Sequence, residues 1–316
     1  MNQTEATFNS HKDLIQSGAV LGLGMLMLAG AAFVALSSFR SAPVAAEQEV
    51  AMVTPAPNAY ANVNLIGQAA IVYDLATGET LYAEDADRPL PLASLTKLLT
   101  MYAAAGVLQD GSPVVITPKA LAQDGESGFI EGQTFTFDDL ARLALVASSN
   151  DAAEAIAEAA AETRNVGDTQ LLAGAAAAAG LTKTRAENGT GLDINTQEAG
   201  AYGSARDMAT LAGKLLAKAP AIAGSTVDPS VSVRSTDGVV HALPNTNQGV
   251  VHVPGILLSK TGFTDIAGGN LVVVYDAGIG HPVAVAVLGS TRDGRFTDVE
   301  KLIKATGAHF AGIADN

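Results

Sequence analysis

The chain has 316 residues, of which 32 are acidic and 18 basic, giving a formal net charge of −14 at pH 7. A nucleic-acid-binding protein would normally be basic, so this balance indicates that the chain has no nucleic-acid partner. Cysteine is absent, which excludes disulfides, thiolate metal sites and a cysteine nucleophile. With 48% hydrophobic and only 16% charged residues, the chain can bury a substantial core.

The first predicted element is an apolar segment, residues 14–39, in which no residue is charged. It is longer than the roughly 20 residues that a membrane-crossing helix needs. A cleaved signal peptide is the alternative, with small residues at 42–46 as its cleavage region, but its apolar core would span only about 7–15 residues. We therefore predict an uncleaved transmembrane helix after a short tail, residues 1–13. The flanking charges do not decide its orientation.

Residues 40–66 combine three prolines with Ala, Asn and Val and have no helical or strand periodicity, which predicts a linker. A folded domain is expected over residues 67–316. It opens with two strand-like segments, residues 69–75 and 79–83, around the turn Ala76-Thr77-Gly78.

Helix-forming and strand-forming patterns then alternate along the domain. Helices are predicted at 94–105, 137–147, 151–162, 173–179, 207–217 and 295–312. Three β-rich segments, 256–260, 270–276 and 282–288, have the spacing of an antiparallel meander. This order predicts an α+β fold whose sheet joins distant parts of the chain, with a helical insert at about residues 108–220.

Several common catalytic motifs are missing from the sequence. There is no G-x-S-x-G elbow, H-E-x-x-H, Walker loop or dinucleotide fingerprint, and the five histidines lack metal-ligand spacing. We therefore predict no metal site and no cofactor. A Ser-His-Asp triad stays open, although nothing in the sequence favours one.

Ser94-Leu95-Thr96-Lys97 places a hydroxyl and an amine three residues apart at the start of a predicted helix. Positions i and i+3 share a helix face, so Lys97 can reach the Ser94 oxygen. A lysine whose pKa is depressed by burial and by a second cation can act as the base that a serine nucleophile needs. Taken alone the pattern is weak, because Ser94 could equally be a first-turn residue and Lys97 a solvated charge.

Two further motifs follow, each occurring once. Ser148-Ser149-Asn150 lies in the break between two predicted helices, where ordinary helix capping is the simpler interpretation of the segment by itself. Lys260-Thr261-Gly262 ends a β-rich segment and could be an ordinary strand end, but its glycine would also let another chain approach the strand backbone.

The order Ser-x-x-Lys, Ser-x-Asn, Lys-Thr-Gly is that of penicillin-binding proteins and class A β-lactamases. With the surrounding segments, above all residues 91–97, 131–153 and 260–271, the chain resembles the serine-type D-alanyl-D-alanine carboxypeptidases, the low-molecular-mass penicillin-binding proteins of peptidase family S11. The resemblance covers about residues 66–313. It implies a β-lactamase/transpeptidase-like fold: a five-stranded antiparallel sheet flanked by helices, with an all-helical subdomain.

The resemblance also implies catalytic roles. Ser94 would be the acylated nucleophile and Lys97 its general base, while Ser148 would relay protons to the leaving amine. Backbone N–H groups of Ser94 and Phe263 would form the oxyanion hole.

Substrate binding would fall to Asn150, Lys260, Thr261 and Gly262, and the strand at 260–263 would pair with the extended peptide. The expected partners are peptidoglycan stem peptides ending in D-Ala-D-Ala, with β-lactams as inhibitors.

Many family members carry a C-terminal β-rich domain and an amphipathic membrane helix. Here the closing helix is followed only by a few residues, so we expect membrane attachment through residues 14–39. A peptidoglycan substrate then implies a single-pass protein of the bacterial cytoplasmic membrane, with its catalytic domain outside.

Other functions remain open. The same three motifs would serve a DD-endopeptidase, a transpeptidase or a β-lactamase, although the lactamase needs a deacylating glutamate and Glu187, the nearest candidate, lies in a carboxypeptidase-like segment. A non-catalytic cell-wall-binding domain is the third possibility. Such a domain would be indicated by the loss of residues from one or more of the three motifs.

Overall fold

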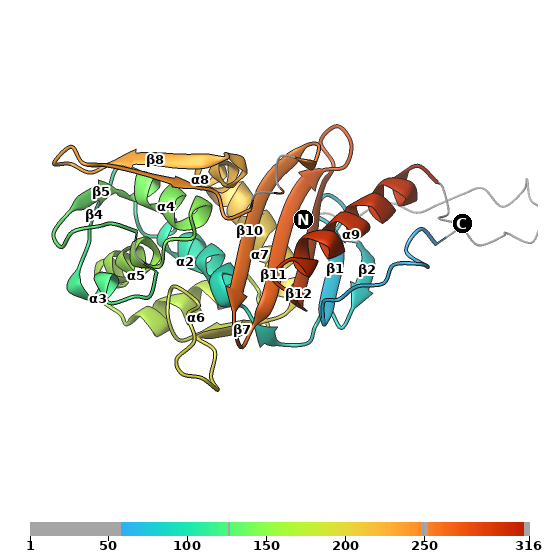
Figure 1. Cartoon of the computed structure of the whole chain (residues 1–316), viewed down its shortest axis with the longest axis horizontal. Helices are drawn as coiled ribbons and strands as arrows, with labels where there is room; N and C mark the ends of the chain where they lie inside the picture. Colours follow the sequence, from blue (N-terminus) through green and yellow to red (C-terminus); the bar gives the residue numbers. More distant parts are fainter. Residues whose placement is uncertain (1–57, 126, 248, 250–251, 313–316) are drawn as a thin grey trace, which may run out of the picture. The chain divides into compact units, whose positions relative to one another are not determined.

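The computed structural model describes residues 58–312 apart from 126, 248, 250 and 251 (Figure 1). Within this described part, no helix has the length and apolar character needed to cross a membrane. The predicted transmembrane helix, residues 14–39, lies outside the described residues and stays a prediction.

A five-stranded antiparallel sheet, in the order β10-β11-β12-β1-β2, organises the described part of the chain. Its strands are β1 (Ala69–Asp74), β2 (Thr80–Glu84), β10 (Ile256–Thr264), β11 (Gly268–Asp276) and β12 (Pro282–Ser290). β1 pairs with β12 from Ala69 opposite Leu288 to Asp74 opposite Val283. The predicted hairpin, the meander and the sheet that joins distant segments are therefore confirmed.

Both faces of this sheet are covered by helices, as Figure 1 shows for α9 in front and α7 behind. α7 spans Ala205–Lys218 and α9 spans Gly294–Phe310. Alternate residues of β12 serve two separate cores: Ala284, Ala286 and Leu288 belong to the core that includes α7, and Val283, Val285 and Val287 to the core that includes α9. Strands covered on both faces become continuously apolar, and this explains the valine-rich sequences.

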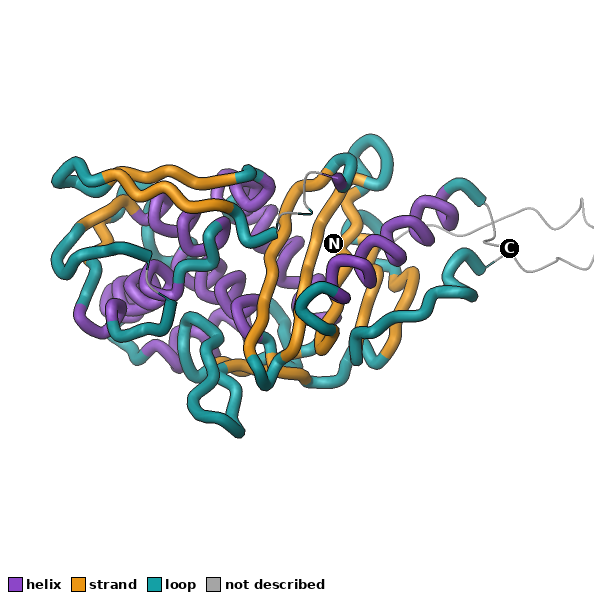
Figure 2. Tube along the Cα trace, in the orientation of Figure 1, coloured by secondary structure: helices purple, strands orange, loops and turns teal. Residues whose placement is uncertain are grey.

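The remaining long helices gather beside the sheet, on the side of β10 (Figure 2). They are α2 (Thr96–Ala104), α4 (Phe137–Val146), α5 (Asn150–Arg164) and α6 (Asp168–Ala178), accompanied by the short α3 (Pro118–Leu121), α8 (Pro220–Gly224), η1 (Ala93–Leu95) and η2 (Ser225–Val227). α2 is the central helix of the group: it packs against α4, α5, α6 and α7, and all residues from Thr96 to Met101 are buried.

The structure differs in two respects from the helical insert expected at about residues 108–220. The segment also contains strands, and α7 at its end packs on the central sheet rather than within the helical group alone. The strands within it are β4 (Pro113–Val115), β5 (Thr134–Thr136), β6 (Arg185–Ala186) and β7 (Ala201–Gly203). The short strand β3 (Leu90–Pro91) precedes the segment, and a hairpin, β8 (Ser230–Arg234) with β9 (Val240–Pro244), follows it. Most of these strands have two or three residues, too few for a period-2 pattern to be recognised.

The predicted linker, residues 40–66, is also too long at its C-terminal end. Ala59 and Tyr60 are buried, and the Tyr60 hydroxyl donates to Thr306 Oγ1 on α9 at 3.0 Å. The backbone N–H groups of Ile66 and Gly67 donate to the Asp298 carboxylate at 3.0 and 2.9 Å. The chain is thus packed on α9 from about residue 58. The sequence pattern did not predict this contact, because one tyrosine in a Pro- and Ala-rich stretch produces no periodicity.

Asn270 joins the sheet to the turn that precedes α2. This side chain on β11 is fully buried, and its Nδ2 donates to the carbonyls of Pro91 and Leu92 at 2.9 and 3.0 Å. Its Oδ1 accepts from the N–H of Gly289 at 2.8 Å. Three backbone groups from two separate segments therefore depend on one amide side chain.

We expect Asn270→Ala to lower the free energy of unfolding by about 2–4 kcal/mol, because it removes three hydrogen bonds to buried backbone groups. Urea unfolding followed by circular dichroism measures the effect. Asn195→Ala, at an exposed turn, is the control and should change stability by less than about 0.5 kcal/mol. Equal effects of the two substitutions would contradict the role of Asn270 in joining the segments.

Candidate active site

Ser94 lies in η1, the turn immediately before α2, and is partly exposed between the buried Ala93 and Leu95. Ala93 has a positive φ of 47°, a backbone conformation that costs free energy in a residue other than glycine. The Ala93 carbonyl accepts from Thr96 Oγ1 at 2.7 Å. A Cβ at Gly191 would come within 1.9 Å of that carbonyl oxygen, so only glycine fits against this turn. The Ser94 turn is thus held in a strained conformation by its neighbours.

Lys97, in the first turn of α2, is fully buried and its amine reaches Ser94 as the spacing predicts. Its Nζ donates to Ser94 Oγ at 2.8 Å, to Asn150 Oδ1 at 2.6 Å and to the Thr190 carbonyl at 3.0 Å. All three acceptors are neutral groups. The amine is therefore hydrogen-bonded but has no carboxylate among these acceptors to stabilise its charged form.

The electrostatic setting of the two buried lysines follows from this. Burial lowers the pKa of Lys97 from 10.5 to about 7, although the nearby charge of Asp151 opposes the change. Burial also lowers the pKa of Lys260 well below its usual value, and the positive charges of Lys97 and Arg295 add to the effect. Near neutral pH the site can therefore supply an unprotonated amine beside a hydroxyl.

Ser148-Ser149-Asn150 forms the connection between α4 and α5. Capping falls to Ser149, whose hydroxyl accepts from the Ala152 N–H at 3.1 Å. Ser148 has a positive φ of 60°, and its Oγ accepts from Lys260 Nζ at 2.9 Å. Asn150, besides accepting from Lys97, donates through Nδ2 to the Asp124 carbonyl at 2.5 Å. The simple capping interpretation therefore applies only to Ser149, and its two neighbours point into the site.

Lys260-Thr261-Gly262 lies on β10, the edge strand of the central sheet, so among the described strands its second edge has no partner in that sheet. Lys260 and Thr261 are buried, and Thr261 Oγ1 is 2.8 Å from Thr246 Oγ1. A Cβ at Gly262 would lie 2.9 Å from the Leu92 carbonyl oxygen and 3.2 Å from the Ser94 nitrogen. Glycine at this position lets the strand backbone pass close to the amide of Ser94.

Phe263, the next residue, is partly exposed, and the guanidinium of Arg292 lies over its ring at 3.8 Å from the centroid. Taken together, these contacts join the three predicted motifs, Ser-x-x-Lys, Ser-x-Asn and Lys-Thr-Gly. Lys97 contacts Ser94 and Asn150, and Lys260 contacts Ser148.

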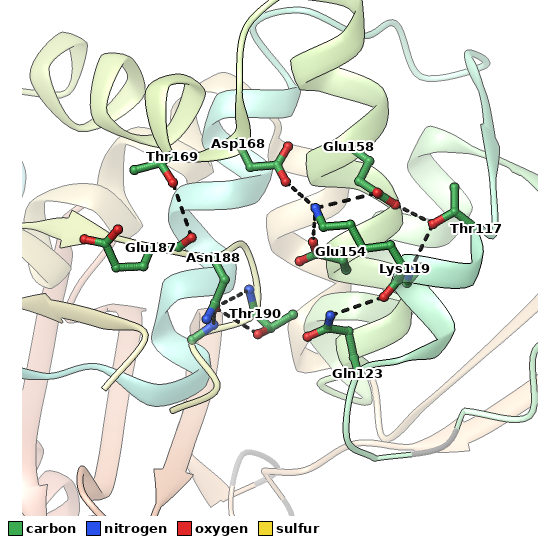
Figure 3. A network of polar contacts seen from close by, with 12 residues as sticks. Thr117, Lys119, Gln123, Glu154, Glu158, Asp168, Thr169, Glu187, Asn188 and Thr190 are labelled. Atoms are coloured by element: carbon green, nitrogen blue, oxygen red, sulfur yellow. Dashed lines mark hydrogen bonds and ion pairs between the residues drawn. The ribbon is translucent and has the colours of Figure 1, made fainter. Parts of the chain in front are cut away.

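Three groups without a predicted role support this arrangement. Arg295 on α9 donates through Nη1 to the Gly262 carbonyl at 2.7 Å. Thr246 contacts Thr261, and the Thr190 carbonyl accepts from Lys97. Asn188 shapes the Thr190 turn, since its Oδ1 accepts from the N–H groups of Thr190 and Gly191 at 3.2 and 2.7 Å (Figure 3). The segments around Thr190 and Thr246 belong to the family resemblance of the sequence, whereas Arg295 had no such signal.

An ion-pair network supports the helix that carries Asn150. Lys119 of α3 lies 2.6 Å from Glu154 and 3.6 Å from Glu158 of α5, and also contacts Asp168 of α6 (Figure 3). α3 leads to Asp124, the residue whose carbonyl binds Asn150. Glu187 is exposed and its carboxylate points away from the Asn188–Thr190 turn in Figure 3. No group of three potential metal ligands occurs within the described residues.

Comparisons with known proteins agree with this geometry. The family model described as D-alanyl-D-alanine carboxypeptidase, Peptidase S11, matches residues 55–292. D-alanyl-D-alanine carboxypeptidase DacF of Bacillus subtilis is 30% identical over 244 residues, which are 75% of this chain and 61% of that protein. The chain therefore spans less than two thirds of this relative.

Two further proteins are similar. A D-alanyl-D-alanine endopeptidase of Pseudomonas aeruginosa is 30% identical over 220 residues, covering 66% of this chain and 67% of that protein. The crystal structure of penicillin-binding protein D2 from Listeria monocytogenes in its ampicillin-bound form matches with a TM-score of 0.66 and 28% identity, over 77% of this chain and 98% of that one. The similarity thus extends from sequence to fold.

Proposed function

This chain belongs to the D-alanyl-D-alanine carboxypeptidase family, Peptidase S11, and from that membership we propose that it is a serine-type D-Ala-D-Ala carboxypeptidase that trims peptidoglycan stem peptides. The single observation that carries the proposal is the contact of the buried Lys97 amine with Ser94 Oγ at 2.8 Å. An amine whose pKa is about 7 is a base at neutral pH, and a serine hydroxyl needs such a base to react.

In the first half-reaction, Lys97 is neutral, so its Nζ lone pair accepts from the Ser94 hydroxyl while its two N–H groups serve Asn150 and Thr190. Lys97 takes the Ser94 proton as Ser94 Oγ bonds to the carbonyl carbon of the penultimate D-Ala. The N–H groups of Ser94 and Phe263 stabilise the oxyanion. This role is supported by the close approach of β10 to the Ser94 nitrogen at Gly262. The C–N bond then breaks, the leaving amine receives the proton from Lys97 through Ser148, and the terminal D-Ala departs.

In the second half-reaction, water enters the position that D-Ala left. Lys97 and Ser148 take one of its protons, the resulting hydroxide adds to the acyl carbon, and the Ser94 ester breaks with return of the proton to Ser94 Oγ. The reaction uses no metal and no cofactor. The Lys260 amine donates to Ser148 Oγ at 2.9 Å. It therefore orients the Ser148 hydroxyl both when the proton passes to the leaving amine and when a proton is taken from water.

Substrate positioning uses the free edge of β10. An extended peptide adds to this edge as a further strand, the carboxylate of the terminal D-Ala binds Thr261 and Lys260, and the Asn150 amide holds the peptide backbone. The buried position of Thr261 beside Thr246 supports this assignment, because their hydroxyls lie within 2.8 Å of each other.

The same chemistry would serve an endopeptidase, and the similar Pseudomonas aeruginosa protein bears that name. The two activities differ only in what is released, a free D-Ala or a cross-linked peptide. A β-lactamase is less well supported, because Glu187 is exposed and its carboxylate points away from the Asn188–Thr190 turn. A β-lactam keeps its leaving group tethered, so without a positioned base the acyl-enzyme should persist.

Residues 14–39 are proposed to hold the catalytic domain at the outer face of the bacterial cytoplasmic membrane as a single-pass helix. Support comes from the length of the uncharged segment and from the location of a peptidoglycan substrate.

The proposed activity is tested by incubating the full-length protein with a stem pentapeptide and measuring released D-Ala by mass. We expect steady release of D-Ala, and a penicilloyl adduct on Ser94 that lasts for minutes or longer. Ser94→Ala should abolish both, and Lys97→Ala should slow acylation at least about 1,000-fold, because members of a cooperating catalytic set act as a unit.

Ser230→Ala, an exposed serine on β8, is the matched control and should retain full activity. Circular dichroism establishes that each variant is folded. Rapid turnover of penicillin without D-Ala release would show a β-lactamase instead, and release of cross-linked peptide without D-Ala would show an endopeptidase.

The pH dependence of acylation follows from the lowered pKa of Lys97. Below pH 7 the amine is protonated and cannot accept the Ser94 proton, so the rate of acylation by a fluorescent penicillin should fall about tenfold for each pH unit. Above pH 7 the rate should reach a plateau. A rate that is constant between pH 5 and 8 would mean that another group is the base.

N-terminal sequencing of the protein isolated from its native membrane tests the anchor. The expected mature protein retains residues 14–39. A mature N-terminus between Ala42 and Val50 would instead identify a cleaved signal peptide.

A further inference from the structure

A cavity of about 410 Å³ lies among the helices, lined by neither Ser94 nor any other residue of the proposed active site. It is formed by the C-terminal ends of α2, α5 and α7 and by one side of α6. Its apolar lining includes Val107, Val166, Leu171 and the ring of Tyr102. Its volume falls within the range of about 300–1,000 Å³ that is usual for small-molecule sites.

The ionisable groups at this cavity, apart from the Tyr102 hydroxyl, are two cations, Arg164 and Lys218, and no carboxylate lines it within the described residues. Lys218 Nζ lies 4.3 Å from the centroid of the Tyr102 ring, and a Cβ at Gly106 would be 2.8 Å from the same nitrogen. The ammonium is thus placed over the apolar lining.

Neither cation makes an ion pair or side-chain hydrogen bond with another described residue. This contrasts with Lys119, which contacts three carboxylates, although the chain as a whole has 32 acidic residues against 18 basic ones. The carbonyl ends of α5 and α7 offset part of the two charges, since cations are favoured at helix C-termini.

The two cations are close enough to affect each other. Burial lowers the pKa of Lys218, and the positive charge of Arg164 lowers it further. An anion placed between them would relieve this repulsion, and an apolar group attached to the anion would remove the cavity lining from water.

We propose that this cavity binds a small amphiphilic anion with a single tail, its carboxylate or phosphate head group between Arg164 and Lys218 and its apolar body against Tyr102 and Leu171. The site is distinct from the proposed peptidase centre and does not depend on that activity.

The test uses the full chain in phosphatidylcholine nanodiscs and isothermal titration calorimetry with octanoate, with empty nanodiscs as the blank. We expect saturable binding at one site, weakened when salt is raised from about 50 to 500 mM because salt screens exposed charges. Octanamide has the same tail without the charge, and should bind at least about tenfold more weakly.

Three variants separate the charges from the cavity. The double variant Arg164→Gln/Lys218→Gln should bind octanoate at least about tenfold more weakly, and Lys214→Gln, an exposed lysine of α7 outside this cavity, should bind it normally. Gly174→Leu should abolish binding of both probes, because the glycine lines the cavity and a Cβ there meets no atom within 4 Å. Leucine also favours the helix over glycine, so this variant should remain folded.

Three results would overturn the proposal. The first is the absence of saturable heat with octanoate, and the second is equal affinity for octanoate and octanamide. The third is a double variant whose melting temperature falls while its affinity for octanoate is unchanged, since the cations would then serve only the helix ends.

Discussion

The amine of Lys97 is buried without a carboxylate among its hydrogen-bond acceptors, and the rest of the site depends on this constraint. Removing an ammonium from water is costly unless an opposite charge compensates. Here Ser94, Asn150 and Thr190 supply only neutral oxygens, so the amine is hydrogen-bonded but its charged form is disfavoured. The central position of α2, packed on all sides, maintains this burial. Fold and reactivity are thus linked through one side chain.

Close backbone approach brings the other groups to this amine. Gly191 touches the Ala93 carbonyl at a distance that no side chain would permit. Gly262 brings β10 close to the Ser94 turn, where a Cβ would lie 2.9 Å from the Leu92 carbonyl oxygen and 3.2 Å from the Ser94 nitrogen. Arg295 then fixes the Gly262 carbonyl from α9, and Asn270 ties the same sheet to the segment before η1. The helical group and the sheet therefore meet along backbone contacts at Ser94, which explains why residues from distant parts of the sequence converge there.

The sequence predicted those parts of the structure that local patterns encode. The helices, the three-stranded meander and the Ser94–Lys97 contact depend on spacing within a few residues, and these were confirmed. Arg295 could not be found in this way, because its partner at Gly262 is remote in sequence and a helical arginine has no distinguishing pattern. The same reason applies to the packing of Tyr60 on α9 and to the two- and three-residue strands of the helical group. Tertiary contacts, rather than periodicity, determine these features, so the sequence pattern did not predict them.

The most direct test of this account is a ¹³C NMR titration of the Lys97 side chain in ¹³C-lysine-labelled protein, with the Lys97 signal assigned by its loss in Lys97→Met. The account predicts a midpoint near pH 7. It also predicts a still lower midpoint in Asp151→Asn, because the Asp151 charge raises the Lys97 pKa and the amide keeps the shape of the side chain. A midpoint near the usual value of 10.5 would contradict the claim that burial maintains the amine as a base.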